Sequence, residues 1–246
     1  MPSEGGPSDG PWTPQLGVGA WLLALAASVL IAPFVALPLF LIGVDEQTVM
    51  TWLIPLAPLI TGIVALVVAA TSRGGSVRTL FGDGAVRAAH LLIALGVGVV
   101  SFIVFNIGFG ALLSVLLQLL GLDPPELQPS LRDAAGRPEA IGILILSTSV
   151  VAPLGEELLY RGLLFQALLS RFSARAAILL SAGAFGVGHL TFGAPWLSNV
   201  TLMILIIPLG AVLAWAFLRW RTLWVPIVIH AVFNAITVLL MAGGFF

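Results

Sequence analysis

The stretch GEELLYRG, residues 155–162, places Glu156, Glu157 and Arg161 inside a long apolar run. The residues before it, IGILILSTSVVAPL, and after it, LLFQALL, carry no charge. A charge at membrane depth costs several kcal/mol unless it is paired or hydrated, so such residues mark a functional site by default. The chemistry of this chain is therefore expected around these three side chains.

The sequence spacing of the three charged residues predicts different roles for them. Glu157 and Arg161 are four residues apart and share one helix face, with the acid on the N-terminal side. We predict that they form an ion pair. Glu156 lies about 100° around the helix from Glu157 and has no local counter-charge. A carboxyl group left in that state can act as a general base or acid.

Two histidines also fall inside apolar runs, each within a short motif. AGAFGVGHL puts Phe185 and His189 on one helix face, and HAVFN puts His230 and Asn234 four residues apart. Imidazole and carboxamide together can donate two hydrogen bonds to one oxygen, as an oxyanion hole requires. We interpret Phe185 as a packing residue.

Other residues of these runs have structural interpretations. The residues around the first histidine motif are small and allow a second helix to approach closely; they are Ala182, Gly183, Ala184, Gly186 and Gly188. His90, near a membrane interface, has no partner motif and is interpreted as structural. Asn106 is expected to make a helix–helix contact.

The composition of the chain indicates whether water or lipid surrounds it. Of 246 residues, 59% are hydrophobic and 9% are charged, whereas a soluble domain carries roughly 25% charged residues. With a mean hydropathy of +1.13, the chain is predicted to be an all-α polytopic membrane protein. The absence of cysteine excludes disulfides and thiolate sites. A net charge of -1 gives no indication of a nucleic-acid partner.

A crossing needs roughly 20 apolar residues. The sequence predicts about seven, leaving seven or eight open: 17–42, 49–71, 88–120, 139–170, 175–191, 196–219 and 222–243. Pro153 and Gly155 are expected to interrupt the fourth helix just before the glutamates. Residues 1–16, rich in Pro, Gly and Ser, are expected to be a flexible tail, and 17–246 a single transmembrane helical domain with its motif-bearing core at about 139–240.

Arginine placement predicts the orientation. With seven crossings, one side carries Arg73, Arg78, Arg87, Arg171, Arg175, Arg219 and Arg221, and the other carries Arg132 and Arg137. The positive-inside rule then places the N-terminus in the cytoplasm and the C-terminus outside the cell membrane. Glu156, His189 and His230 lie roughly 13 to 22 Å along their helices from the nearest of these arginines. They are expected to meet in one cavity that opens toward the cytoplasm.

The motifs EExxxR (Glu156, Glu157, Arg161), FxxxH (Phe185, His189) and HxxxN (His230, Asn234), each on its own apolar helix, resemble the CPBP or Abi family. This family comprises CAAX proteases and bacteriocin-processing proteins, and it includes the type II CAAX prenyl endopeptidases. The resemblance covers about 139–240 and implies an all-helical intramembrane endopeptidase. Family members often have eight helices, whereas only about a dozen residues follow Asn234 here.

The resemblance also implies roles for the motif residues. Glu156 would activate a water molecule with the help of His189, and His230 and Asn234 would stabilise the oxyanion. Glu157 and Arg161 would hold the helix of the first glutamate. Family members are described as metalloproteases, and a divalent metal such as zinc is left open, with Glu156, His189 and His230 as its ligands. The zincin motif HExxH is absent.

The expected substrate is a membrane-associated peptide or protein, either prenylated and CAAX-like or bacteriocin-like, met within the surrounding lipid. One alternative is a non-catalytic membrane scaffold or bacteriocin self-immunity protein that uses the same polar cluster structurally. Another is a transporter or proton relay, because buried glutamate and histidine can pass protons. Against transport, the polar residues gather in one zone and no inverted repeat is visible.

Overall fold

The computed structural model describes residues 11–191 and 193–245, and within them the chain forms helices and no strand. The α-helices are α1 (Pro14–Leu41), α2 (Glu46–Leu53), α3 (Leu56–Thr71), α4 (Val77–Leu80), α5 (Ala88–Ser101), α6 (Gly110–Leu119), α7 (Pro129–Ala135), α8 (Ile141–Leu146), α9 (Ala152–Glu157), α10 (Gln166–Leu169), α11 (Ala174–Val187), α12 (Trp196–Trp220) and α13 (Trp224–Ala242). Three π-helical segments join some of them: η1 (Phe102–Phe109), η2 (Ser147–Val151) and η3 (Leu158–Phe165).

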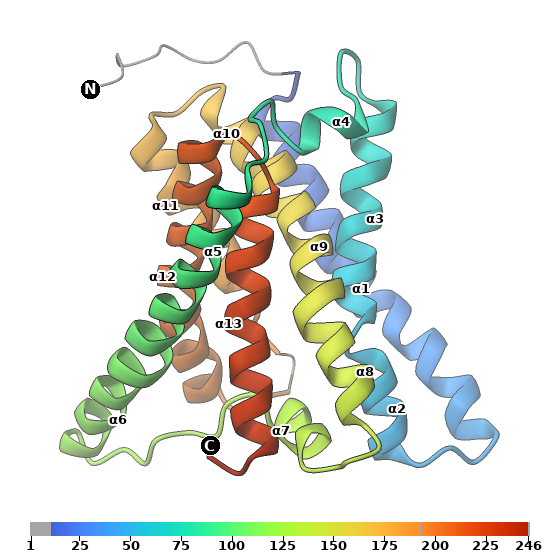
Figure 1. Cartoon of the computed structure of the whole chain (residues 1–246). Helices are drawn as coiled ribbons and strands as arrows, with labels where there is room; N and C mark the ends of the chain where they lie inside the picture. Colours follow the sequence, from blue (N-terminus) through green and yellow to red (C-terminus); the bar gives the residue numbers. More distant parts are fainter. Residues whose placement is uncertain (1–10, 192, 246) are drawn as a thin grey trace.

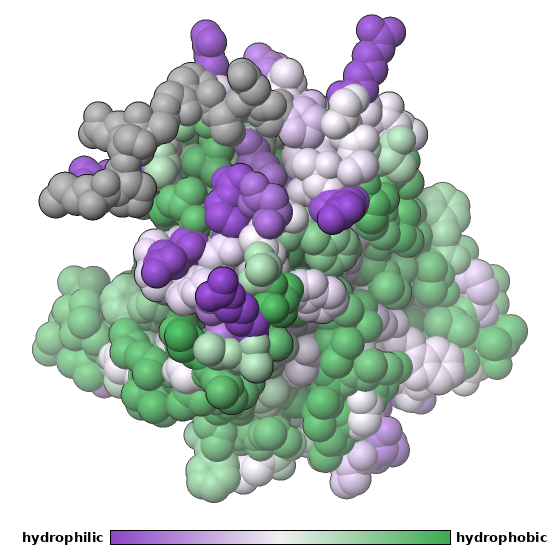
Figure 2. Space-filling view, turned by 45° about the horizontal axis from the view of Figure 1, so that its top comes forward, coloured by the Kyte–Doolittle hydropathy of each residue, from purple (hydrophilic) through white to green (hydrophobic). Residues whose placement is uncertain are grey.

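Six helical stretches of the described chain are long and apolar enough to cross a membrane. They are Pro14–Leu41, Glu46–Thr71, Ala88–Leu119, Ile141–Leu169, Trp196–Trp220 and Trp224–Ala242. The prediction of a polytopic all-α membrane protein is confirmed. Large apolar side chains cover the outside of the bundle, where lipid takes the place of water as solvent (Figure 2).

The fifth predicted crossing differs from the prediction. α11 has 14 residues and rises about 21 Å, which is less than the roughly 30 Å of the hydrocarbon core. The helix ends at Val187 with Gly188 as its C-cap, and His189 lies in the turn beyond it instead of inside the helix. Gly188 packs directly against the hydroxyl of Tyr160, so a side chain at this position would collide with the central span.

At the other end of the chain, residues 1–10 of the predicted tail lie outside the described residues. α1 begins at Pro14, slightly before the predicted start at 17. The Thr13 hydroxyl accepts a hydrogen bond from the Leu16 amide at 3.3 Å and caps the helix. Pro14, which has no amide hydrogen to leave unpaired, occupies the first helical position.

The ends of the bundle differ in charge. α1 begins and α13 starts at the end where α4 and α10 lie, and α13 finishes at the end where α7 lies (Figure 1). The connections from α3 to α5, from α10 to α11 and from α12 to α13 share the first end, and these connections and the helix ends beside them carry the seven arginines that were predicted to lie together. Hydrophilic side chains gather at this end in Figure 2.

The span that carries the glutamates runs through the middle of the bundle as α8–η2–α9–η3–α10 (Figure 1). The predicted interruption takes the form of two π-helical segments, η2 and η3, on either side of α9. Pro153, at the start of α9, has no amide hydrogen to donate to the preceding turn. Such π segments rotate the helix face and occur often at functional sites.

α3 and α9 touch through glycines immediately before the first glutamate. A β-carbon on Gly62 would lie 3.0 Å from the Cα of Gly155, and one on Gly155 would overlap the carbonyl of Pro58. Two backbones can approach this closely only where both positions lack a side chain. The contact fixes the position of α9, and with it that of Glu156.

We expect Gly155→Ala to destabilise the protein by about 1–3 kcal/mol, because the added methyl group forces α9 away from the backbone of α3. Thermal unfolding in detergent measures the effect. Gly142→Ala is the matched control, since Gly142 lies in the same span and has nothing within 4 Å of an added β-carbon. An equal change in both variants would contradict the packing argument.

The α11–α12 contact confirms the expected role of small residues. Gly186 packs against Met203 and Ile207, and Gly210 of α12 packs against Ala182 and Phe185. Gly183, by contrast, faces open space.

Two polar residues outside the motifs contact other helices. The Asn106 amide donates to the Thr237 hydroxyl at 3.1 Å, which confirms the expected helix–helix contact. The His90 ring lies beside Trp220, with 6.3 Å between ring centroids.

Candidate functional site

The Glu157–Arg161 ion pair lies at the centre of the site. Arg161 Nη1 donates to Glu157 Oε1 at 2.9 Å, and neither side chain is exposed. The predicted pairing is confirmed. Because the two residues share one helix face, η3 preserves their contact although its backbone is π-helical.

Both members of this pair also bind other helices. Glu157 Oε1 accepts a second hydrogen bond from His230 Nδ1 of α13 at 3.0 Å. Arg161 Nη2 donates to the carbonyl of Gly210 in α12 at 2.9 Å. Its guanidinium carbon lies 4.4 Å from the centre of the Phe185 ring of α11. The pair therefore joins the central span to three further helices, and Phe185 packs as predicted.

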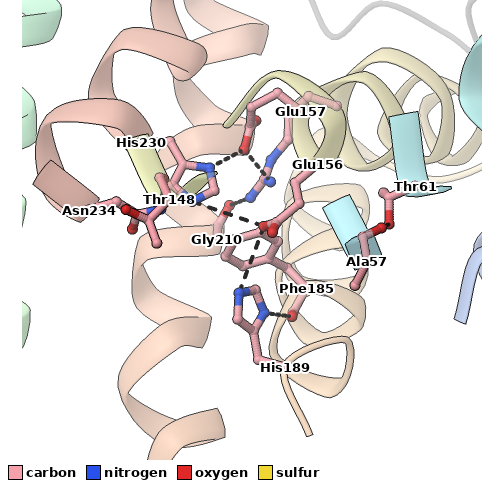
Figure 3. A network of polar contacts seen from close by, with 11 residues as sticks. Ala57, Thr61, Thr148, Glu156, Glu157, Phe185, His189, Gly210, His230 and Asn234 are labelled. Atoms are coloured by element: carbon pink, nitrogen blue, oxygen red, sulfur yellow. Dashed lines mark hydrogen bonds and ion pairs between the residues drawn. The ribbon is translucent and has the colours of Figure 1, made fainter. Parts of the chain in front are cut away.

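Glu156 points away from this pair, as its helical position predicts. Its Oε2 atom lies 3.7 Å from His189 Nε2 and 4.0 Å from His230 Nε2 (Figure 3). The structure thus brings together three of the predicted site residues from three separate segments. The Glu156 side chain is 16% exposed and that of His189 20%, while that of His230 is 3% exposed. The site is consequently accessible on the Glu156–His189 side.

The Oε2 atom of Glu156 is buried and has no hydrogen-bond partner. Distances of 3.7 and 4.0 Å to the two imidazoles are too long for direct hydrogen bonds. A polar contact of this length is suited to a bridging water.

The tautomers of both histidines follow from their partners. His189 Nδ1 lies 2.7 Å from the carbonyl of Phe185, which can only accept, so Nδ1 carries the hydrogen. The His230 Nδ1 hydrogen goes to the Glu157 carboxylate by the same reasoning. In their neutral forms both rings therefore present an Nε2 lone pair to Glu156. With two carboxylates and one arginine, a single additional proton makes the buried cluster electrically neutral.

Asn234 lies at the edge of this arrangement. Its Nδ2 donates to the carbonyl of Thr148 in η2 at 2.8 Å. Figure 3 shows Asn234 and Thr148 on one side of His230, with Glu156 and His189 on the other. One Nδ2 hydrogen of Asn234 is left over, and its role at an oxyanion stays a prediction. Sequence reasoning missed Thr148, whose only signal is a polar STS triplet within an apolar run.

The donor types of Glu156, His189 and His230 are those that zinc uses. Among the described residues, however, no three histidine, cysteine or acidic side chains are arranged to hold a metal ion. His230 uses Nδ1 for Glu157, and its Nε2 stands 4.0 Å from the carboxylate. As placed, these three side chains do not form a closed three-ligand metal site.

Fold and site together define a class: a multi-pass helical membrane protein with a buried ion pair beside a glutamate and two imidazoles. Residues 138–236 match the family model described as Type II CAAX prenyl endopeptidase Rce1-like. This match, over 99 of the 246 residues, confirms the resemblance to the CPBP family drawn from the three motifs.

A curated relative supports this family. The chain is 28% identical over 102 residues to the Bacillus subtilis (strain 168) protein named "Putative membrane peptidase YdiL". The alignment covers 42% of this chain and 38% of that protein. No solved structure matches the chain.

Proposed function

We propose that the protein is an intramembrane endopeptidase. The observation that carries the proposal is the buried, unpartnered Oε2 of Glu156 facing the Nε2 atoms of His189 and His230. A carboxylate and an imidazole lone pair can each accept one hydrogen of a water molecule placed between them. The family model of the Rce1-like prenyl endopeptidases, which covers this site, supports the same chemistry.

In the proposed reaction the water attacks the carbonyl carbon of a peptide bond. Glu156 takes one proton as the new carbon–oxygen bond forms, and His189 holds the second hydrogen and so orients the attacking oxygen. Glu156 then returns its proton to the leaving nitrogen as the carbon–nitrogen bond breaks. The products are a free carboxyl group and a free amine, and the protein is unchanged.

We assign oxyanion stabilisation to His230 and Asn234. His230 is held by the Glu157 carboxylate on Nδ1 and can donate from Nε2 when it is doubly protonated. Asn234 would contribute the Nδ2 hydrogen that Thr148 does not use. Glu157 and Arg161 position His230 and the glutamate helix, and they do not touch the substrate.

We propose a membrane-associated peptide or protein as the substrate, either prenylated and CAAX-like or bacteriocin-like. The arginine-rich end of the bundle is proposed to face the cytoplasm, with the C-terminus outside and the site open toward the cytoplasm. Residues 17–246 are proposed to form one transmembrane domain with its core at about 139–240.

The test is proteolysis in water enriched in oxygen-18. Purified protein in proteoliposomes is mixed with membrane peptides from host cells, and new C-termini are identified by mass spectrometry. Hydrolysis places one heavy oxygen in each new carboxyl group. If the wild type forms no more labelled product than Glu156→Ala protein, the result favours the scaffold or self-immunity alternative. Proton flux without cleavage would favour a relay.

We expect cleavage to survive removal of metal. Because the three donors do not form a metal-ligating group, protein treated with a chelator and verified by elemental analysis is expected to keep its rate within about twofold. Loss of activity on chelation with recovery on addition of zinc would contradict this expectation and return Glu156, His189 and His230 to the role of ligands.

A further inference from the structure

A groove away from the glutamates runs along the lipid-facing surface between α5–η1 and α12. Its volume is about 460 Å³, within the roughly 300–1,000 Å³ of small-molecule sites. Apart from Ser101 its walls are apolar, including Val97, Val100, Val212 and Trp215. The surrounding helices span the membrane, so the groove is accessible to lipid acyl chains.

Two arginines lie beyond one end of the groove. Along α12, Val212, Trp215 and Arg219 follow one another at intervals of three and four residues and share a helix face. Along α5, the groove residue Ile93 lies six positions after Arg87, which is the residue at the N-cap of the helix. α5 begins and α12 ends at the arginine-rich end of the bundle (Figure 1). Arg87 and Arg219 therefore lie at the same end of the bundle, where the contact of His90 with Trp220, 6.3 Å between ring centroids, places the start of α5 beside the end of α12.

These two arginines are not neutralised within the described residues. Arg221 forms two hydrogen bonds with Asp83, at 3.1 and 3.3 Å, and these hold the pKa of the Asp83 carboxyl below its usual range. Neither Arg87 nor Arg219 has such a partner, both are exposed, and α5 and α12 contain no acidic residue.

Aromatic rings lie at the same end of the groove. The guanidinium of Arg219 lies 5.7 Å from the Trp220 ring centre, and Trp220 packs on Trp215 with 5.4 Å between centroids. Tryptophan is typical of the level of the lipid headgroups. The mouth of the groove thus has the depth of a headgroup and an unbalanced positive charge.

We infer that this groove binds one anionic glycerophospholipid, with an acyl chain against the apolar wall and the headgroup phosphate between Arg87 and Arg219. The apolar wall accepts the chain of any lipid, whereas the arginines select for negative charge. None of the groove residues belongs to the Glu156 site, so the inference does not depend on the proposed proteolysis.

The test is native mass spectrometry of the detergent-solubilised full chain, titrated with dioleoyl phosphatidylglycerol or dioleoyl phosphatidylcholine. We expect the first lipid to bind at least about tenfold more tightly than the second, from two arginines at the membrane surface. The double variant Arg87→Gln/Arg219→Gln should lose this preference. The control Arg171→Gln/Arg175→Gln removes the same charge at the same end of the bundle and should keep it.

A second pair of variants tests the acyl-chain wall. Gly96 lines the groove and has nothing within 4 Å of an added β-carbon, so Gly96→Leu fills the groove without disturbing the fold. It should weaken both lipids by a similar factor. Gly19→Leu, at an equally open position on α1, should weaken neither. Equal binding of the two lipids by the wild type, or unchanged binding by the arginine double variant or by Gly96→Leu, would overturn the inference.

Discussion

Glu156→Gln protein is expected to fold normally and to lose about 10²- to 10⁴-fold in cleavage rate, the range that a general base contributes. The amide keeps the size of the side chain but cannot take a proton from water. Folding should survive, because Oε2 of Glu156 makes no hydrogen bond that the substitution would break. Single-turnover cleavage of a labelled membrane peptide measures the loss, and thermal unfolding in detergent checks the fold.

Glu139→Gln provides the matched control, since Glu139 is an exposed acid outside the site. It should cleave at the rate of the wild type. Turnover by Glu156→Gln protein at that same rate would remove the catalytic assignment. Unlike Glu156→Ala, the glutamine variant opens no cavity, so a loss of rate is not attributable to collapse of the site.

The second large effect is on stability. Glu157→Ala is expected to cost about 3–5 kcal/mol, because a buried charge loses its partner. The change leaves both the Arg161 guanidinium and the His230 Nδ1 hydrogen without their shared acceptor. Arg161→Ala should cost less, since Glu157 keeps His230. Thermal unfolding of both variants in detergent gives the order.

The exposed pair Arg132–Glu126 is the control for this experiment. Its atoms are 3.5 Å apart and its side chains are 48% and 55% exposed, so Arg132→Ala should change stability by less than about 1 kcal/mol. Unchanged melting for both site variants would reject the role of the pair. A larger loss for Arg161→Ala than for Glu157→Ala would reject the sharing of Glu157 with His230.

Local rules account for what the sequence predicted well. The long apolar runs correspond to spans because each crossing needs its own uninterrupted length of hydrophobic residues. The i,i+4 spacing was sufficient to predict the Glu157–Arg161 ion pair, since both partners lie on one helix. Glu156, His189 and His230 could be predicted to lie close together, because polar side chains within a membrane face the bundle interior and pair with one another.

Partners on other helices were not predictable in the same way. Asn234 and Thr148 are 86 residues apart, and nothing in their spacing relates them. The second bond of Glu157, to His230, connects residues 73 apart. The π-helical segments η2 and η3 also lay outside the prediction, which assumed 3.6 residues per turn throughout. The early end of α11, where Gly188 lies against Tyr160, was also not predicted.

The short α11 has a consequence for the bilayer itself. A rise of about 21 Å leaves roughly 9 Å of hydrocarbon thickness unmatched beside the helix. Peptide groups outside a helix cannot be left among acyl chains without partners. Asn199 Oδ1 accepts from the Thr191 amide at 2.8 Å, and Asn199 Nδ2 donates to the Thr191 carbonyl at 3.0 Å. The bilayer adjusts to such a mismatch by thinning locally. We therefore expect the bilayer to be thinner beside His189 than beside the six longer helical stretches of the described chain.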